Sequence, residues 1–468
     1  MTQQEFWQGQ ESDNRVFVHE DGVGNLTFDE IFSEAEELGG FLSGTPLALV
    51  AVNTWSFVAA YIALLRKRTP FLLLDPSLEP DYTDRVCRTF GIKEIWSPVL
   101  GATPGSGAKA LVDMMSWDSN EARSSSSVYE ELAMLMPTSG STGSPKSVRV
   151  SRQNLIASTA SISRYLEMTP ERVLISSLPF HYTYGLSLLN LSLYSRSKMV
   201  ITRSGVLSKE FWDLFSRLAV TDFSGVPFHF ESLQRQGFPR EALGSLQCVT
   251  QAGGKLAPAI TQKFLNYAES WGFQFFTMYG QTEATPRISY VPPSQSRQKL
   301  GSVGVPIDIG KITVRNEQGS EAAAFEVGEV FYEGPNVCLG YASSESDLEK
   351  GDLLNGLLGT GDLGYLDEDG YLFLTGRAGR EIKVSGHRVN LDEISNHMGE
   401  IGLAVAVSGA TNRIVIEVLG SAKDVRSALK SFSRIHPTRV EIYEVDELTR
   451  LPSGKLDIAA LNLRWNIG

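Results

Sequence analysis

The sequence has few cysteines, and they follow no pattern. Among 468 residues only Cys87, Cys248 and Cys338 carry a thiol. They are odd in number, widely spaced and outside any metal-ligand spacing, which excludes a disulfide framework and a structural zinc site. The sequence therefore predicts small buried core cysteines in a reduced, cytoplasmic compartment.

Positive charge and long hydrophobic runs are also scarce. Lys and Arg total 42 against 54 Asp and Glu, a formal net charge of −12. Such a balance argues against a general binder of nucleic acid or anionic membranes, although a local basic groove would be compatible with it. The apolar stretch "FVAAYIALL" (57–65) is about half a membrane span, and the N-terminus shows no secretory signal.

What the chain does have is an alternation of short apolar strands and helices. Its length exceeds what one hydrophobic core usually supports, so we expect two or more domains. The strands "PLALVAVN" (46–53) and "FLLLD" (71–75) flank a buried helix at 55–67, and "LQCVTQAGG" (246–254) and "FQFFTMYG" (273–280) flank a helix at 258–271. This alternation predicts an α/β fold with parallel βαβ layers.

After residue 300 the pattern becomes β-rich, and the last 90 or so residues again mix strands with helix. The flexible "GRAGRE" (376–381) separates the two patterns. We therefore predict a large N-terminal region of several subdomains, residues 1–378, and a small mobile α+β domain, residues 379–468.

A hydroxyl-rich stretch, "TSGSTGSPK" (138–146), lies between an apolar strand and a predicted helix whose N-cap is Ser151. In α/β proteins anions bind at such a place, and the glycines, hydroxyls and lysine could all face a phosphate. The stretch lacks the spacing of a Walker A loop. A disordered surface loop is the alternative.

Three further motifs follow in order: "YGQTEA" (279–284), "GTGDLGYLDEDGYLFLTGR" (359–377) and "LPSGK" (451–455). Together with the hydroxyl-rich stretch they resemble the adenylate-forming superfamily, which includes acyl- and aryl-CoA ligases. The resemblance implies a reaction that joins a carboxylate to ATP, gives acyl-AMP and pyrophosphate, and then passes the acyl group to a thiol. Fixed donors and positive charge should carry most of such a reaction between two anions.

The resemblance implies a phosphate clamp in the hydroxyl-rich stretch, although Ser147 stands where the family usually has Gly. The clamp residues are Thr138, Ser139, Gly140, Ser141, Thr142, Gly143 and Lys146.

The second motif follows a predicted strand. Tyr279 would stack on adenine and Gly280 would lie beside the nucleotide, while Thr282 would bind the α-phosphate and Glu283 would ligate Mg²⁺. The alternative is a core tyrosine followed by the start of a capped helix.

In the third and fourth motifs, Asp362 resembles the aspartate that binds both ribose hydroxyls, and Arg377 would reach the ribose or phosphate. The same segment predicts a β-hairpin. Lys455, on a Pro/Gly loop, would bridge the carboxylate and the α-phosphate. An exposed surface lysine is the alternative.

Gly379 lies where the family usually has Asp or Lys at an interdomain hinge. The segment "EIKVSGHRVN" (381–390) resembles the part that swings in to line the thiol tunnel, with Lys383 and Gly386 beside the thiol.

His181 in "SLPFHYTYGL" (177–186) resembles the gate of the acid pocket, with a satisfied core histidine as the alternative. Gly253 would line the pocket and the adenine rim, or pack in the core. Amino-acid-activating relatives place an Asp in the segment that corresponds to 177–186. Its absence here predicts an acid without an α-amine.

These motifs predict an ATP- and Mg²⁺-dependent acid–thiol ligase that takes an acyl or aryl carboxylic acid and not a free amino acid. The acceptor would be CoA or the phosphopantetheine of an acyl carrier protein. A kinase or P-loop NTPase would need a Walker-type loop, which is absent. A non-catalytic nucleotide-binding scaffold is the second alternative, and the presence of Lys455, Glu283 and Asp362 argues against it.

Overall fold

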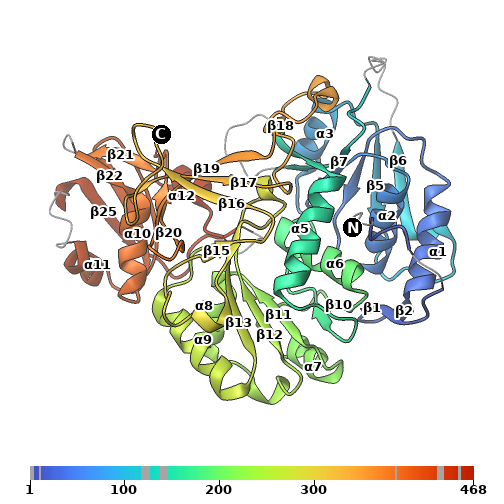
Figure 1. Cartoon of the computed structure of the whole chain (residues 1–468), viewed down its shortest axis with the longest axis horizontal. Coiled ribbons are helices and arrows are strands. Elements are labelled where there is room, and N and C mark those ends of the chain that lie inside the picture. The colour runs from blue at the N-terminus through green and yellow to red at the C-terminus, as the bar shows by residue number, and fades with distance from the viewer. Residues whose placement is uncertain are drawn as a thin grey trace.

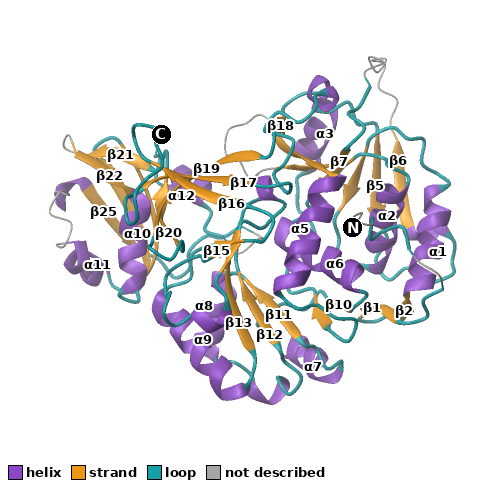
Figure 2. Ribbon diagram, viewed as in Figure 1, coloured by secondary structure: helices purple, strands orange, loops and turns teal. Residues whose placement is uncertain are grey.

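The protein is described by a computed structural model, in which two large sheets and several small ones are covered by helices (Figure 1). Figure 2 shows helices on the outside of both large sheets and between them. The described residues are 5–9, 12–116, 127–137, 146–384, 387–429, 437–451 and 455–467.

The first large sheet has seven strands in the order β18-β8-β7-β4-β3-β5-β6. Its centre, β7-β4-β3-β5, is parallel, as the alternating pattern predicted. Its strands are β3 (Leu47–Val50), β4 (Phe71–Leu74), β5 (Glu94–Pro98), β6 (Val112–Ser116), β7 (Leu132–Pro137), β8 (Ser147–Ser151) and β18 (Tyr341–Ala342), with helices α1 (Phe28–Gly39), α2 (Trp55–Arg66), α3 (Pro80–Thr89) and α4 (Ala108–Leu111) around them.

The second large sheet has nine strands in the order β15-β14-β13-β12-β11-β9-β10-β1-β2. The run from β13 to β1 is parallel. Its strands are β1 (Val16–Glu20), β2 (Gly24–Thr27), β9 (Val173–Ile175), β10 (Lys198–Ile201), β11 (Asp222–Gly225), β12 (Cys248–Gln251), β13 (Gln274–Tyr279), β14 (Ser289–Tyr290) and β15 (Val305–Pro306), with helices α5 (Arg152–Tyr165), α6 (Thr183–Ser195), α7 (Lys209–Arg217), α8 (Pro227–Gln236) and α9 (Pro258–Trp271).

Local sequence explains where the helices begin. Thr27 caps α1 in a capping box with Glu30, and Ser151 caps α5 in the same way with Asn154. Buried residues cover nearly every side of α2 because it packs between the two sheets, where α5 and α6 also contribute to one continuous apolar core. Helices α7, α8 and α9 pack on the other face of the nine-stranded sheet in a second core. The fold is thus a stack of alternating helical and sheet layers.

The β-rich portion is a four-stranded antiparallel sheet, and it includes the predicted hairpin as β19 and β20. C-terminal residues build smaller sheets with cores of their own. The elements are β16 (Lys311–Arg315), β17 (Gly328–Glu333), β19 (Leu357–Leu366), β20 (Leu372–Arg377), β21 (Glu381–Val384), β22 (His387–Asn390), α10 (Leu391–Glu400), β23 (Ala404–Ala410), β24 (Arg413–Leu419), α11 (Ala422–Ala428), β25 (Val440–Glu444) and α12 (Ile458–Arg464). The predicted α/β class, with a β-rich portion and a small α+β C-terminal part, is confirmed.

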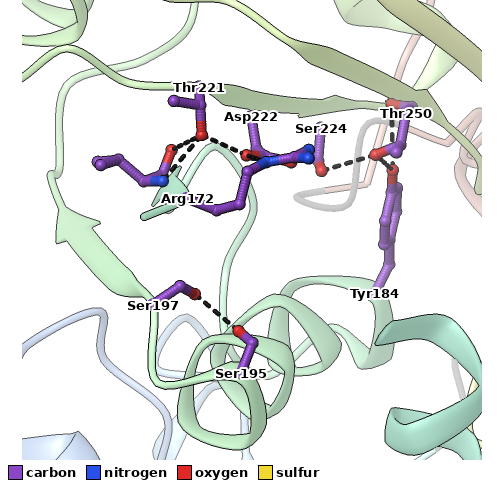
Figure 3. Close-up of polar contacts among 9 residues, drawn as sticks. Arg172, Tyr184, Ser195, Ser197, Thr221, Asp222, Ser224 and Thr250 are labelled. Atoms are coloured by element: carbon purple, nitrogen blue, oxygen red, sulfur yellow. Dashed lines mark hydrogen bonds and ion pairs between the residues drawn. The ribbon is translucent and has the colours of Figure 1, made fainter. Parts of the chain in front are cut away.

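A buried polar network ties neighbouring parallel strands of the nine-stranded sheet together (Figure 3). The Arg172 guanidinium, just before β9, donates through Nε to Asp222 Oδ2 on β11 at 2.7 Å and forms a second bond to Oδ1. Thr221 also donates to Asp222, at 2.5 Å. Burial lowers the pKa of Arg172, but the hydrogen bonds and charge of Asp222 outweigh it and raise that pKa. Arg172 is therefore fully charged.

The three cysteines are buried free thiols, as predicted. Burial raises the pKa of Cys87 and of Cys338 to about 12, so neither is a thiolate at neutral pH. Across the described ranges, no helix has both the length and the apolar character that crossing a bilayer requires.

Candidate active site

Three parallel strands bring the predicted residues to one edge of the nine-stranded sheet. β11, β12 and β13 are in register, so Gly225, Gln251 and Thr277 lie side by side near their carboxyl ends. In open α/β sheets, ligands bind outside this edge. Gly253 follows β12 with a φ of +83°, and a Cβ there would lie 2.5 Å from the Tyr182 hydroxyl. Glycine is favoured at this position because side chains other than glycine are strained at this φ.

The turn after β13 carries Thr282 and Glu283 on a single 3-10 turn, Thr282–Ala284. Gly280 lies two residues before this turn, where a Cβ would be 1.7 Å from the Pro286 carbonyl oxygen. The Thr282 hydroxyl is 2.9 Å from that of Thr183 at the start of α6. Both hydroxyls therefore sit where the helix and the strand edge meet.

Glu283 lies close to the end of the hydroxyl-rich stretch. Its Oε1 accepts a hydrogen bond of 2.7 Å from the Tyr341 hydroxyl. The Lys146 ammonium lies 3.5 Å from the centroid of the same tyrosine ring, a cation–π contact. Tyr341 therefore links a cation and an anion that the sequence placed at two separate motifs.

The remaining residues predicted for the phosphate clamp, Thr138, Ser139, Gly140, Ser141, Thr142 and Gly143, lie outside the described residues, and so does Gly386. Lys383 is on β21 with its side chain exposed. Within the described part of the chain it forms no ion pair with the residues gathered at the sheet edge. Its place at a thiol tunnel stays a prediction.

Asp362 is the centre of a buried hydrogen-bond set between β13 and the β19–β20 hairpin. Its Oδ2 accepts from the Tyr279 hydroxyl at 2.5 Å, and its Oδ1 accepts from Arg377 Nε at 2.8 Å. Burial first, and then the Asp362 charge, raise the pKa of Tyr279 well above its usual value, so the phenol stays protonated and donates. Tyr279 is only 8% exposed, so adenine stacking on its ring stays a prediction.

The Lys455 ammonium lies 5.5 Å from the centroid of the Tyr182 ring. Burial of the ammonium lowers the pKa of Lys455, and the Arg377 charge lowers it further, whereas Glu283 and Asp362 act in the opposite direction. The residue as a whole is exposed, while the charges of those three side chains act on its ammonium. Residues far apart in the sequence thus meet at one place.

A backbone hairpin holds Lys455 there. Leu451 N donates to Lys455 O at 2.8 Å, and Asp457 N donates to Thr449 O at 2.9 Å. Between these bonds Arg450 pairs with Leu456, and it donates to Glu231 of α8 at 3.0 Å. The Arg450 guanidinium also lies 5.0 Å from the Phe228 ring centroid. Arg450 therefore holds the hairpin that carries Lys455 against helix α8.

His181 lies just before α6, half-buried, with Nε2 3.3 Å from Asp75 Oδ2 at the end of β4. Burial lowers its pKa, although the Asp75 charge opposes the shift, so the ring is neutral at pH 7. Its buried Nδ1 has no hydrogen-bond partner among the described residues. A satisfied core histidine would have one, so the geometry favours the pocket alternative.

This arrangement can hold a nucleotide and a metal ion. Within the described residues, no group of three or more His, Cys, Asp or Glu side chains could enclose a metal. Mg²⁺ is usually bound by one or two carboxylates together with substrate phosphates. Glu283, beside Lys146, fits that kind of site.

Sequence reasoning missed several residues around the site. Tyr182 and Thr183 lie inside the segment quoted for His181, and Arg287 follows the "YGQTEA" motif by three positions, so a wider reading of those motifs could have found them. Nothing in the local sequence of Tyr341, Glu231 or Arg450 marks them, because their roles depend on contacts between distant segments.

Residues 5–342 match the family of AMP-binding enzymes. The chain is 28% identical to 2-succinylbenzoate–CoA ligase of Bacillus subtilis (strain 168) over 397 residues, 82% of this chain and 76% of that protein. It is also 28% identical to oxalate–CoA ligase of Arabidopsis thaliana over 381 residues, 76% of this chain and 73% of that protein. A structure of the Bacillus subtilis O-succinylbenzoate coenzyme A synthetase in complex with ATP and magnesium ion matches with a TM-score of 0.74 at 23% identity, covering 96% of this chain and 98% of that one.

Proposed function

Because the chain belongs to the AMP-binding enzyme family, we propose that it is an ATP-dependent acid–thiol ligase. It activates an acyl or aryl carboxylic acid as the acyl-adenylate, releases pyrophosphate and then passes the acyl group to the thiol of CoA. The relatives that support this proposal are CoA ligases for 2-succinylbenzoate and oxalate, neither of which is an amino acid.

The single observation that carries the proposal is the position of Lys455. Its ammonium lies where the charges of Glu283, Asp362 and Arg377 all act on it. There Lys455 would contact both the carboxylate and the α-phosphate and stabilise the negative charge that develops as the C–O–P linkage forms. Thr282 would donate to the same phosphate, and His181 would border the acid.

The other predicted residues would orient the nucleotide. Asp362 would accept hydrogen bonds from the ribose hydroxyls, held in place by Tyr279 and Arg377. Lys146 and the hydroxyl-rich stretch would bind the β- and γ-phosphates. Glu283 would hold Mg²⁺, which when bound supplies positive charge that offsets the charge of the phosphates.

We further propose that residues 1–378 and 379–468 are two domains that change their relative orientation between the two steps. Gly379 has a φ of +88°, and a Cβ there would meet no described atom within 4 Å, so the backbone there uses the freedom that glycine provides. A rotation of the second domain about Gly379 would move Lys455 away from the site after adenylation and bring Lys383 and Gly386 to the thiol. An acyl carrier protein is the alternative acceptor, and a cytoplasmic location stays a prediction.

Acid-dependent exchange of labelled pyrophosphate into ATP tests the proposal. The purified enzyme with Mg²⁺ and a panel of carboxylic acids should show exchange that depends on the acid, and CoA or a phosphopantetheinylated carrier protein should then receive the acyl group. A nucleotide-binding scaffold would show no exchange with any acid.

The contacts that Arg450 makes with α8, called here the Arg450 anchor, give a specific prediction. Arg450→Met removes both the 3.0 Å bond to Glu231 and the cation–π contact with Phe228. Partly buried contacts of these kinds contribute about 1–2 kcal/mol together, so acid-dependent pyrophosphate exchange should slow about tenfold. Transfer from pre-made acyl-AMP to CoA should slow less, because the anchor holds only the arrangement that presents Lys455.

Arg413→Met is the matched control, because Arg413 binds Glu441 at 2.9 Å within the C-terminal part itself. It should leave the exchange rate near that of the wild type. Equal exchange rates for Arg450→Met and the wild type would contradict the anchoring role.

A further inference from the structure

Arg287 is a buried cation that the described chain does not neutralise. It is only 2% exposed, and its Nε–H has no hydrogen-bond acceptor among the described residues. In the described ranges no Asp or Glu lies within ion-pair distance of it. Arg172 pairs with Asp222. Arg149 and Arg152 also keep an unpartnered Nε among the described residues, but both donate to backbone carbonyl oxygens through other nitrogens.

Aromatic rings surround the guanidinium instead. Its central carbon lies 5.1 Å from the centroid of the Tyr184 ring. Burial raises the pKa of Tyr182 and of Tyr184 to about 12, and the positive charge of Arg287 opposes both shifts, so this charge lies close to both rings. It acts in the same way on Tyr165. These contacts orient the guanidinium but supply no counter-charge.

The surroundings also hold Arg287 rigidly. The Asn336 side-chain amide donates to the backbone carbonyls of Ala284 and Arg287, at 2.6 and 2.8 Å. The Tyr184 hydroxyl is fixed by Thr250 at 2.6 Å, and Thr250 is in turn bonded to Ser224 (Figure 3). A guanidinium kept in place in this way needs little reorganisation when an anion arrives.

The position of Arg287 connects it to the proposed reaction centre. It follows Glu283 by four residues. The Tyr184 ring beside it lies 6.4 Å from the Tyr182 ring, over which the Lys455 ammonium is found at 5.5 Å. Two tyrosines therefore separate Lys455, proposed to act on the reacting carboxylate, from a second cation that has no ion-pair partner in the described ranges.

A buried guanidinium without an anion is unfavourable, because desolvation of the charge is not offset. We propose that Arg287 determines substrate specificity by binding a second carboxylate at the far end of the acid, so that the enzyme activates dicarboxylic acids. This inference rests on the proposed ligase function and adds the class of acid to it. A planar guanidinium matches a carboxylate with two parallel hydrogen bonds.

Matched pairs of acids in the pyrophosphate-exchange assay test the inference. Each pair has the same carbon skeleton with one or two carboxylates: butanoate and succinate, pentanoate and glutarate, 4-methylbenzoate and terephthalate. For the wild type, kcat/KM should favour the diacid in at least one pair. In Arg287→Met, the ratio of diacid to monoacid kcat/KM should fall about 10- to 100-fold, as expected for loss of hydrogen bonds to a charged group. Arg287→Lys, which keeps the charge, should restore part of the ratio.

Arg196→Met is the control. Arg196 also has a buried Nη1 with no partner among the described residues, but it lies over the Phe28 and Phe32 rings. Its diacid-to-monoacid ratio should equal that of the wild type. A wild type that uses monoacids and rejects every diacid would overturn the inference but not the proposed ligase function. An Arg287→Met variant that lowers kcat/KM for the diacid and for the monoacid by the same factor would also overturn the inference. A wild type that exchanges with no acid of either kind would overturn the ligase function and the inference with it.

Discussion

Lys455→Ala is expected to reduce acid-dependent pyrophosphate exchange by on the order of 10³-fold, since the substitution removes a positive charge from a site that must join two anions. Lys455 is the only one of the proposed catalytic groups supplied by the C-terminal part of the chain. If that part moves away after adenylation, transfer from pre-made acyl-AMP to CoA should remain largely intact. Measuring the two half-reactions separately tests both statements.

Lys423→Ala provides the comparison, because Lys423 is an exposed lysine on α11 of the same C-terminal part. It should change neither half-reaction. Equal losses in both half-reactions of Lys455→Ala would contradict the proposed departure of Lys455 between the steps.

The second large effect is expected on stability. Asp222→Ala leaves the Arg172 guanidinium buried without its carboxylate, and breaking a buried pair in this way typically lowers the free energy of unfolding by about 3–5 kcal/mol. Replacing both partners, as Arg172→Met with Asp222→Leu, should recover most of that loss, because no charge is then left unpaired. Urea denaturation of the two variants measures the difference.

Asp213→Ala is the matched surface control. Asp213 pairs with Lys209 at 2.7 Å, but their side chains are 62% and 82% exposed. Exposed ion pairs contribute little to stability, so the urea midpoint of Asp213→Ala should stay close to that of the wild type. A double variant no more stable than Asp222→Ala would contradict the role assigned to the unpaired charge.

Much of the fold could be predicted because local signals and tertiary structure agree. Thr27 and Glu30 sit at capping-box spacing, and α1 begins there. The helix predicted over 258–271 is α9, bounded by Pro258 and by Gly272 with a left-handed φ. The prediction of the adenylate-forming family, from four short motifs, is confirmed by the match over residues 5–342.

Contacts between distant segments were not predictable in the same way. Glu283 and Lys146 were placed separately, but Tyr341, which lies between them, comes from an edge strand that pairs with β8. The burial of Arg287 depends on α6 and on Asn336, neither of which adjoins it in sequence. Arg450 looks like any charged residue until the hairpin folds against α8. A single sequence carries no local signal for such pairings.

The attachment of the Lys455 hairpin to α8 bears on how this protein could be redesigned. The helix begins directly after Val226 and carries Phe228 and Glu231 on its first turns, so one short element joins the end of β11 to the far end of the polypeptide. Replacing α8 with a foreign helix would therefore weaken the attachment of the Lys455 hairpin and lower turnover. A replacement helix would have to keep the Glu231 carboxylate and the Phe228 ring.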